Sequence, residues 1–134
     1  MSQENVEVVR GVYRAWDDGD LDALLATCDP DVELLTSGSF PDLAAVYRGH
    51  AGMRTFWDSM RAPWESFRLD PERIVEGEAC AVVAVHFRAR GKGSGVTADL
   101  QQGHALRFNN RRLIIKVSTH RSFEEALEAV GLSE

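Results

Sequence analysis

The stretch EACAVVAVHFRARGKGSGVTADLQQGHALRF, residues 78–108, decides the fold class. Its two halves, 78–91 and 95–108, are rich in Val, Ala and Phe, and the glycine-rich turn GKGSG joins them. Glycine accepts the positive torsions of hairpin turns, so this pattern predicts two long antiparallel strands. Alternate residues of a strand face the same side, which places His104 in line with Leu106 and Phe108. His104 is therefore a buried core residue, a dimer contact or the functional residue of a cavity.

Further strands are expected on both sides of this hairpin. FRLDPERIVEG, residues 67–77, precedes it, and RLIIKVSTH, residues 112–120, follows a second turn, NNRR. Nearer the N-terminus, DVELLTS alternates as a short strand with Val32, Leu34 and Thr36 on one face.

Helical spacing of apolar residues predicts three helices in the first half, at 3–18, 21–28 and 49–62. Asp20 is expected to cap the second helix, and Pro30 to close it. A fourth helix begins at Ser122, where SFEE is a capping box. The order of these elements predicts an α+β fold. We expect a single domain, 1–134, in which a curved antiparallel sheet wraps as a cone around three helices, with a small-molecule pocket at its mouth.

Composition excludes several classes of function. The net charge is −6 and no basic stripe is present, so we expect no nucleic-acid partner. The sequence has no apolar run of membrane length and no signal-peptide pattern, and Cys28 and Cys80 are isolated, which together favour a cytoplasmic protein with reduced thiols and no membrane partner. No histidine pairs with another at helical spacing and no cysteine lies near a histidine, so no metal site is expected.

Three segments resemble the nuclear transport factor 2-like superfamily, in its SnoaL-like and ketosteroid-isomerase-like branch. They are VYRAWDDGDLDALLATCDPDVEL, YRGHAGMRTFWDSM and EEALEAVGL, at 12–34, 47–60 and 124–132. The resemblance implies the cone-shaped fold. It does not single out one activity, because the superfamily includes isomerases, cyclases, dehydratases, epoxide hydrolases and non-catalytic binders.

The resemblance also assigns cavity positions. The helix-one tyrosine of ketosteroid isomerases falls on Val12, with Tyr13 one residue away, and the base falls on Thr36. The supporting tyrosine falls on Trp57, and the strand aspartic acid falls on His104. Val12 has no donor and Thr36 is no base at neutral pH, so ketosteroid isomerase chemistry is not supported.

The same comparison places Lys116, Ser118 and His120 of the last strand in the cavity. A shift of one residue reverses the facing of a strand. That second register would put Ile115, Val117 and Thr119 inside.

From these positions we expect His104 to move a proton, with Gln102 as a hydrogen-bonding neighbour on the same face. Lys116 or His120 would stabilise developing negative charge. The walls would be formed by Val12, Trp16, Thr36, Trp57, Leu106 and Phe108, with Ser118 nearby. The plain structural reading is that His104 is an inward, hydrogen-bonded core residue and that the tryptophans are core.

The expected function is a SnoaL-like enzyme that uses no cofactor. It would transfer protons in an isomerisation, cyclisation or dehydration of a hydrophobic, cyclic or carbonyl-bearing molecule. The rival is a non-catalytic binding or dimerisation domain with the same cavity. A homodimer through the outer sheet face is expected in either case, because both faces of the strands are rich in β-branched residues.

Overall fold

The structure is a computed structural model that describes residues 2–36 and 43–132. In these residues the chain forms four helices and six strands: α1 Ser2–Asp18, α2 Leu21–Ala26, β1 Cys28–Leu35, β2 Val46–Arg48, α3 Gly49–Arg61, β3 Trp64–Gly77, β4 Cys80–Gly91, β5 Thr97–Phe108, β6 Ile114–His120 and α4 Phe123–Ala129. None of the helices within this part of the chain is long and apolar enough to cross a membrane.

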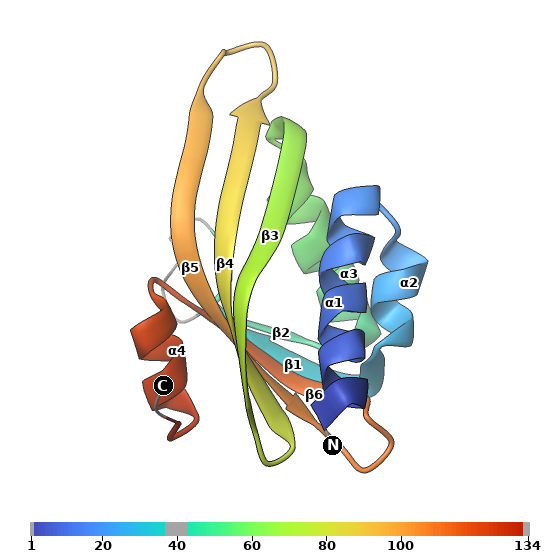
Figure 1. The fold of residues 1–134 in the computed structure, drawn as a ribbon. Helices are drawn as coiled ribbons and strands as arrows, with labels where there is room; N and C mark the ends of the chain where they lie inside the picture. Colours follow the sequence, from blue (N-terminus) through green and yellow to red (C-terminus); the bar gives the residue numbers. More distant parts are fainter. Residues whose placement is uncertain (1, 37–42, 133–134) are drawn as a thin grey trace.

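The six strands form one curved, open sheet in the order β2-β1-β6-β5-β4-β3. Helices α1, α2 and α3 lie against one face, and α4 lies on the opposite face (Figure 1). The predicted α+β class is confirmed. The sheet is mixed, however, because β1 and β6 run parallel while the other neighbours are antiparallel.

The helices form where the apolar spacing predicts them. The inward stripe of α3 is buried as Met53, Phe56, Trp57 and Met60. Asp20 caps α2 as predicted, since its side chain accepts a hydrogen bond from the Ala23 backbone N–H at 3.1 Å.

The end of α2 was predicted wrongly. The helix stops at Ala26, and Pro30 lies inside β1 rather than closing the helix. The pairing of β1 with β6 is irregular between Cys28 and Glu33, so the missing N–H of Pro30 falls where the ladder is interrupted.

A glycine allows the chain to cross from β6 to the outer face of the sheet. A Cβ on Gly103 would lie 2.3 Å from the carbonyl oxygen of Ser122, so no larger residue fits beneath this crossing. Ser122 then caps α4 by accepting a hydrogen bond from the Glu125 N–H at 3.1 Å. The helix covers a second, smaller core formed by Val82, Ala105, Ala126 and Leu127.

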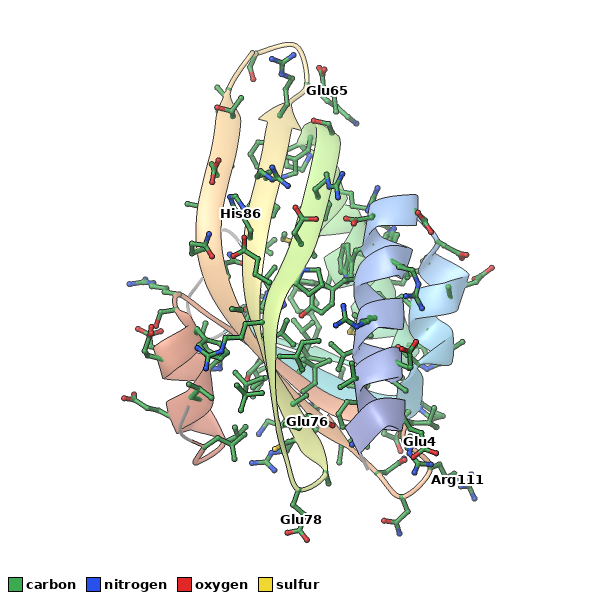
Figure 2. The ribbon with its side chains drawn as sticks, in the orientation of Figure 1. Glu4, Glu65, Glu76, Glu78, His86 and Arg111 are labelled. Carbon is green, nitrogen blue, oxygen red and sulfur yellow. The ribbon has the colours of Figure 1, made fainter. Side chains whose placement is uncertain are left out.

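The outer face that α4 leaves uncovered is charged. Asp70 accepts hydrogen bonds from Arg68, at 3.0 Å, and from Arg88. His86 lies 2.5 Å from Asp99 on the neighbouring strand, and its side chain points away from the helical layer (Figure 2). The apolar part of the outer face is therefore under α4, and the remainder is polar.

Candidate active site

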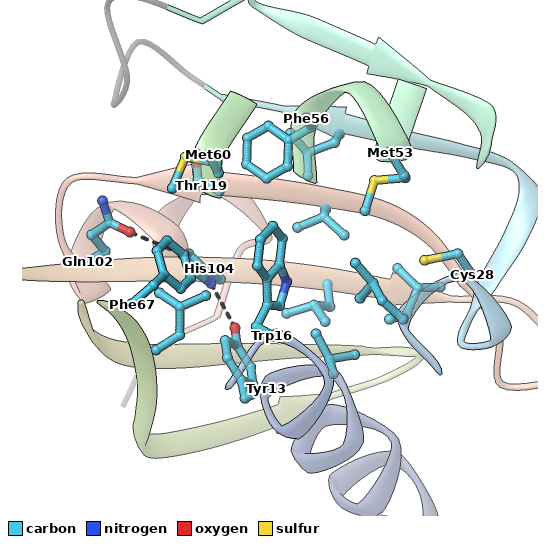
Figure 3. A pocket seen from close by; sticks show the side chains of 17 residues that line it. Tyr13, Trp16, Cys28, Met53, Phe56, Met60, Phe67, Gln102, His104 and Thr119 are labelled. Carbon is cyan, nitrogen blue, oxygen red and sulfur yellow. Dashed lines mark hydrogen bonds between the residues drawn. The ribbon is translucent and has the colours of Figure 1, made fainter. Parts of the chain in front are cut away.

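A cavity of about 50 Å³ lies between the helical layer and the inner face of the sheet (Figure 3). Its lining comes from α1, α2, α3 and the four strands β1, β3, β5 and β6. The lining side chains are Val12, Tyr13, Trp16, Leu24, Cys28, Leu34, Met53, Phe56, Met60, Phe67, Leu69, Gln102, His104, Leu106, Ile114, Val117 and Thr119. Among these described residues there is no Asp, Glu, Lys or Arg. The lining therefore suits a neutral ligand better than a charged one.

The polar centre of the cavity is a hydrogen bond between Tyr13 and His104. The Tyr13 hydroxyl lies 2.7 Å from His104 Nδ1, and the two rings are nearly parallel, with centroids 5.8 Å apart. On the other side of the imidazole, Nε2 lies 3.3 Å from Gln102 Oε1. An amide oxygen only accepts, so His104 carries its proton on Nε2 and accepts the Tyr13 O–H at Nδ1.

Both members of this pair are uncharged at neutral pH. Burial, together with the nearby charge of His120, lowers the pKa of His104 from 6.5 to about 4. Burial raises the pKa of Tyr13 above its ordinary value, because the phenolate loses its hydration. The pair is thus a neutral donor and acceptor in an apolar setting.

The polar groups are gathered at one end of the cavity. Gln102, His104, Thr119 and Tyr13 lie at that end, and Cys28 and Met53 lie at the other (Figure 3). A bound molecule would therefore meet its hydrogen-bonding partners at one end only.

The first helix presents a tyrosine that the family comparison had placed one residue earlier. Val12 does line the cavity, but the hydroxyl that reaches His104 belongs to Tyr13. Tyr13 falls in the same buried helical stripe as Val9 and Trp16, and this spacing is the signal that identifies its inward position.

The other predicted wall residues divide into two groups. Trp16, Gln102 and Leu106 line the cavity with His104. Three more are buried but do not line this cavity: Thr36, whose hydroxyl donates to the Ala44 carbonyl at 3.0 Å; Trp57, whose ring stacks on Trp16 with centroids 4.3 Å apart; and Phe108.

The last strand faces the opposite way from the leading prediction. The pairing of β5 with β6 shifts next to Phe108, and Ile115 is left as an exposed bulge residue. Beyond the bulge, Val117 and Thr119 face the cavity. The side chains of Lys116, Ser118 and His120 lie on the outer face, so they cannot stabilise charge inside the cavity.

Several lining residues were expected only as core. The methionines and Phe56 of α3, together with Leu24 and Cys28, also line the cavity; Met53 and Cys28 lie at its apolar end, and Met60 lies near Thr119 (Figure 3). Their sequence pattern is that of an ordinary buried helix face, which carries no signal of a cavity. No group of three or more metal-ligating side chains comes together in the described residues.

The sequence profile described as SnoaL-like domain matches residues 9–115, which is well over half of the chain. The chain belongs to the SnoaL-like domain family. A comparison with curated proteins found no match for this SnoaL-like chain.

Solved structures share the SnoaL-like fold over almost their whole length. An NTF2-like protein of unknown function from Burkholderia pseudomallei K96243 has 27% identity and a TM-score of 0.79, covering 96% of this chain and 97% of that one. TerC, co-crystallised with polyporic acid, has 23% identity and a TM-score of 0.77 over 92% and 98% of the two chains. The epoxide hydrolase/cyclase-like enzyme SalBIII, described with a role in pyran ring formation in the polyether salinomycin, has 15% identity and a TM-score of 0.75 over 88% and 90%.

Proposed function

We propose that this chain is a cofactor-independent enzyme that transfers protons on a neutral, hydrophobic, carbonyl-bearing small molecule. The reaction would be an isomerisation, a cyclisation or a dehydration. One observation carries the proposal: the Tyr13–His104 hydrogen bond lies at the polar end of a cavity in whose lining, among residues 2–36 and 43–132, no side chain is charged at neutral pH. A buried, paired hydroxyl and imidazole in an apolar cavity are typical of acid–base sites.

The pair can move a proton as a relay. A substrate C–H gives its proton to the Tyr13 oxygen, while the Tyr13 hydroxyl proton passes to His104 Nδ1. The products of this step are an enolate and an imidazolium, and Tyr13 stays neutral. Gln102 Oε1 accepts the Nε2–H throughout and keeps the ring oriented. Return of the proton to a different atom of the enolate completes an isomerisation.

The low basicity of His104 restricts the substrate. A base with a pKa of about 4 is weak at neutral pH, so it can remove only an activated proton. A carbon between two carbonyl groups meets this requirement, whereas the carbon next to an isolated ketone does not. Since Lys116 and His120 lie outside the cavity, the enolate is stabilised by the imidazolium formed in the same step.

Cavity size sets a second condition. A volume of about 50 Å³ holds a few water molecules, whereas a drug-sized ligand needs a pocket of roughly 300 Å³ or more. Met53 lines the apolar end and Met60 lies near Thr119 (Figure 3), and methionine side chains change rotamer readily. We propose that ligand entry displaces these two side chains.

The relatives support a cyclase- or isomerase-type role at the level of the family. SalBIII is described as epoxide hydrolase/cyclase-like, and TerC was crystallised with polyporic acid. The transfer of such activity to this chain is part of the proposal, because the shared property at these identities is the fold.

The proposal is tested with a panel of cyclic 1,3-diketones, flat polyketides and terpenoid ketones. Trp16 lines the cavity, so binding is followed by tryptophan emission and turnover by product analysis. We expect turnover to vanish in His104→Gln, which keeps a hydrogen-bonding side chain but cannot accept the proton at neutral pH. Lys116→Gln, on the outer face, is the matched control and should keep full activity. Equal turnover in His104→Gln and the original chain would refute the relay.

A second candidate function is non-catalytic binding of a small neutral molecule. It is favoured by the small cavity and by the engagement of both His104 nitrogens, with Tyr13 and with Gln102. Saturable quenching of tryptophan emission without any turnover across the panel would select this candidate.

A homodimer in the cytoplasm is part of the proposal. Because α4 covers the apolar part of the outer face, we place the contact on the charged part around Asp70, His86 and Arg88. Such a contact weakens with added salt. Sedimentation velocity at low and high salt tests it, and a monomer at micromolar concentration in low salt would contradict it.

The two free, buried cysteines are compatible with a reducing compartment.

A further inference from the structure

A second hollow lies on the outer face of the sheet, on the opposite side from the Tyr13–His104 cavity. It has a volume of about 220 Å³ and runs between the ends of β1, β5 and β6 and the last residues around α4. We call it the outer groove, and it is lined by Leu35, Ala105, Arg107, Lys116, Ser118, His120, Ala129 and Val130.

The floor of the outer groove is formed by two small side chains, Ala105 and Ser118, and by Leu35. Ser118 pairs with Ala105 on one side and with Leu35 on the other, so these three side chains form one row across β5, β6 and β1. The two long side chains of Lys116 and Arg107 border this row, because these residues pair with each other two positions along the strands from Ser118 and Ala105. The result is a hollow with an apolar floor and a cationic wall.

The charge of the outer groove is opposite to that of the whole protein. Its lining holds Arg107, Lys116 and a histidine, and no acidic side chain among the described residues, whereas the protein carries a net charge of −6. Glu33 is the strand neighbour of Lys116, but its carboxylate is 3.1 Å from Arg48. Two adjacent cations on a hollow surface attract an anion.

His120 stands at the other end of the outer groove and is the weaker cation. Its Nε2 lies 2.8 Å from the Ser118 hydroxyl. Burial lowers the pKa of His120, and the negative charge of Glu125 on α4 only partly offsets this effect. An anionic group is therefore favoured at the Arg107–Lys116 end, and the apolar part of a ligand over Ala105 and Leu35.

We propose that the outer groove binds a small organic acid, with its carboxylate between Arg107 and Lys116 and a short aliphatic chain over Ala105, Leu35 and Val130. The guanidinium of arginine matches a carboxylate with two parallel hydrogen bonds. The volume of about 220 Å³ leaves room for a short aliphatic chain beside the carboxylate. This ligand class differs from that of the inner cavity, where the described lining residues include no Asp, Glu, Lys or Arg.

The test uses three probes that share parts of this ligand. Hexanoate has both the carboxylate and the aliphatic chain, acetate has the carboxylate without the chain, and hexanol has the chain without the carboxylate. Binding is followed by amide chemical shifts of Ala105, Ser118 and Val130 in the full chain, while the Trp16 indole reports on the inner cavity. We expect saturable shifts with hexanoate, and at least about tenfold weaker binding of acetate and of hexanol, since each lacks one of the two contributions.

Variants separate a specific site from general attraction. Loss of two charge-assisted contacts in R107Q/K116M should weaken hexanoate binding by about tenfold or more. Arg90, an exposed arginine of β4 outside the outer groove, provides the matched control, and R90Q should bind hexanoate unchanged. Retained folding of R107Q/K116M is checked by its amide spectrum.

Four results would overturn the proposal. Hexanoate could produce no saturable shift, or R107Q/K116M could bind it as tightly as the original chain. Hexanoate could also shift the Trp16 indole alone, which would place it in the inner cavity. A dimer that hides Ala105 and Ser118 and dissociates in R107Q/K116M would show that a second copy occupies the outer groove instead.

Discussion

The buried state of His104 predicts how the stability of the protein depends on pH. Its pKa is about 4 in the folded chain and 6.5 in the absence of burial. Between these values the unfolded chain binds a proton that the folded chain does not, so the free energy of unfolding falls as the pH is lowered. The stabilisation is complete above pH 6.5 and is lost progressively down to pH 4. Linkage across this interval gives a loss of about 2 kcal/mol between about pH 7 and about pH 4.5.

The matched measurement compares the original chain with His104→Gln. Urea denaturation at several pH values across this interval gives the free energy of unfolding of each. Glutamine does not titrate, so the variant should lose about 2 kcal/mol less than the original chain over the same interval. His120, whose pKa is also lowered, is present in both proteins and cancels from the comparison.

Parallel pH slopes in the two proteins would refute this reasoning. An NMR titration in which the His104 ring of the folded chain shows a pKa near 6.5 would refute it as well. Either result would mean that water reaches the ring freely and that the polar end of the cavity is not closed.

Three further predictions concern single contacts. Tyr13→Phe leaves His104 Nδ1 buried without its partner at 2.7 Å, so equilibrium unfolding should show a loss of about 1–3 kcal/mol. Gly103→Ala places a Cβ 2.3 Å from the Ser122 carbonyl oxygen, and thermal unfolding should report a loss of about 1–3 kcal/mol or more; a neutral result would show that the crossing to α4 is not tightly packed. Ser122→Ala removes the cap of α4 and should cost about 1 kcal/mol, with increased hydrogen exchange confined to that helix.

Most of the fold could be predicted from the sequence, because its periodicities are long and unbroken. The alternation in β4 and β5 and the apolar stripe of α3 each continue over three or more turns or pleats, so single exceptions do not obscure them. The short strand β2 was missed, since Val46–Arg48 is too brief to show a period.

The candidate site was predicted less well, because it depends on single-residue offsets. A bulge at Ile115 reverses the facing of β6, and no sequence pattern in IIKVSTH distinguishes the two registers. Tyr13 and Val12 both face inward, and only the three-dimensional position of His104 shows which of them completes the polar pair. Position 104 itself was predicted correctly as inward-facing, since it alternates with Leu106 and Phe108 on a long strand.

The central claim is that Tyr13 and His104 move a proton of a neutral ligand inside the cavity. Deuterium exchange tests it most directly: a cyclic 1,3-diketone whose exchange in D2O is slow is followed by NMR with and without the protein. We predict that the original chain and Lys116→Gln accelerate exchange at the carbon between the carbonyl groups, and that Tyr13→Phe and His104→Gln do not. Equal acceleration by His104→Gln, or a diketone that quenches Trp16 emission without any exchange, would contradict the claim.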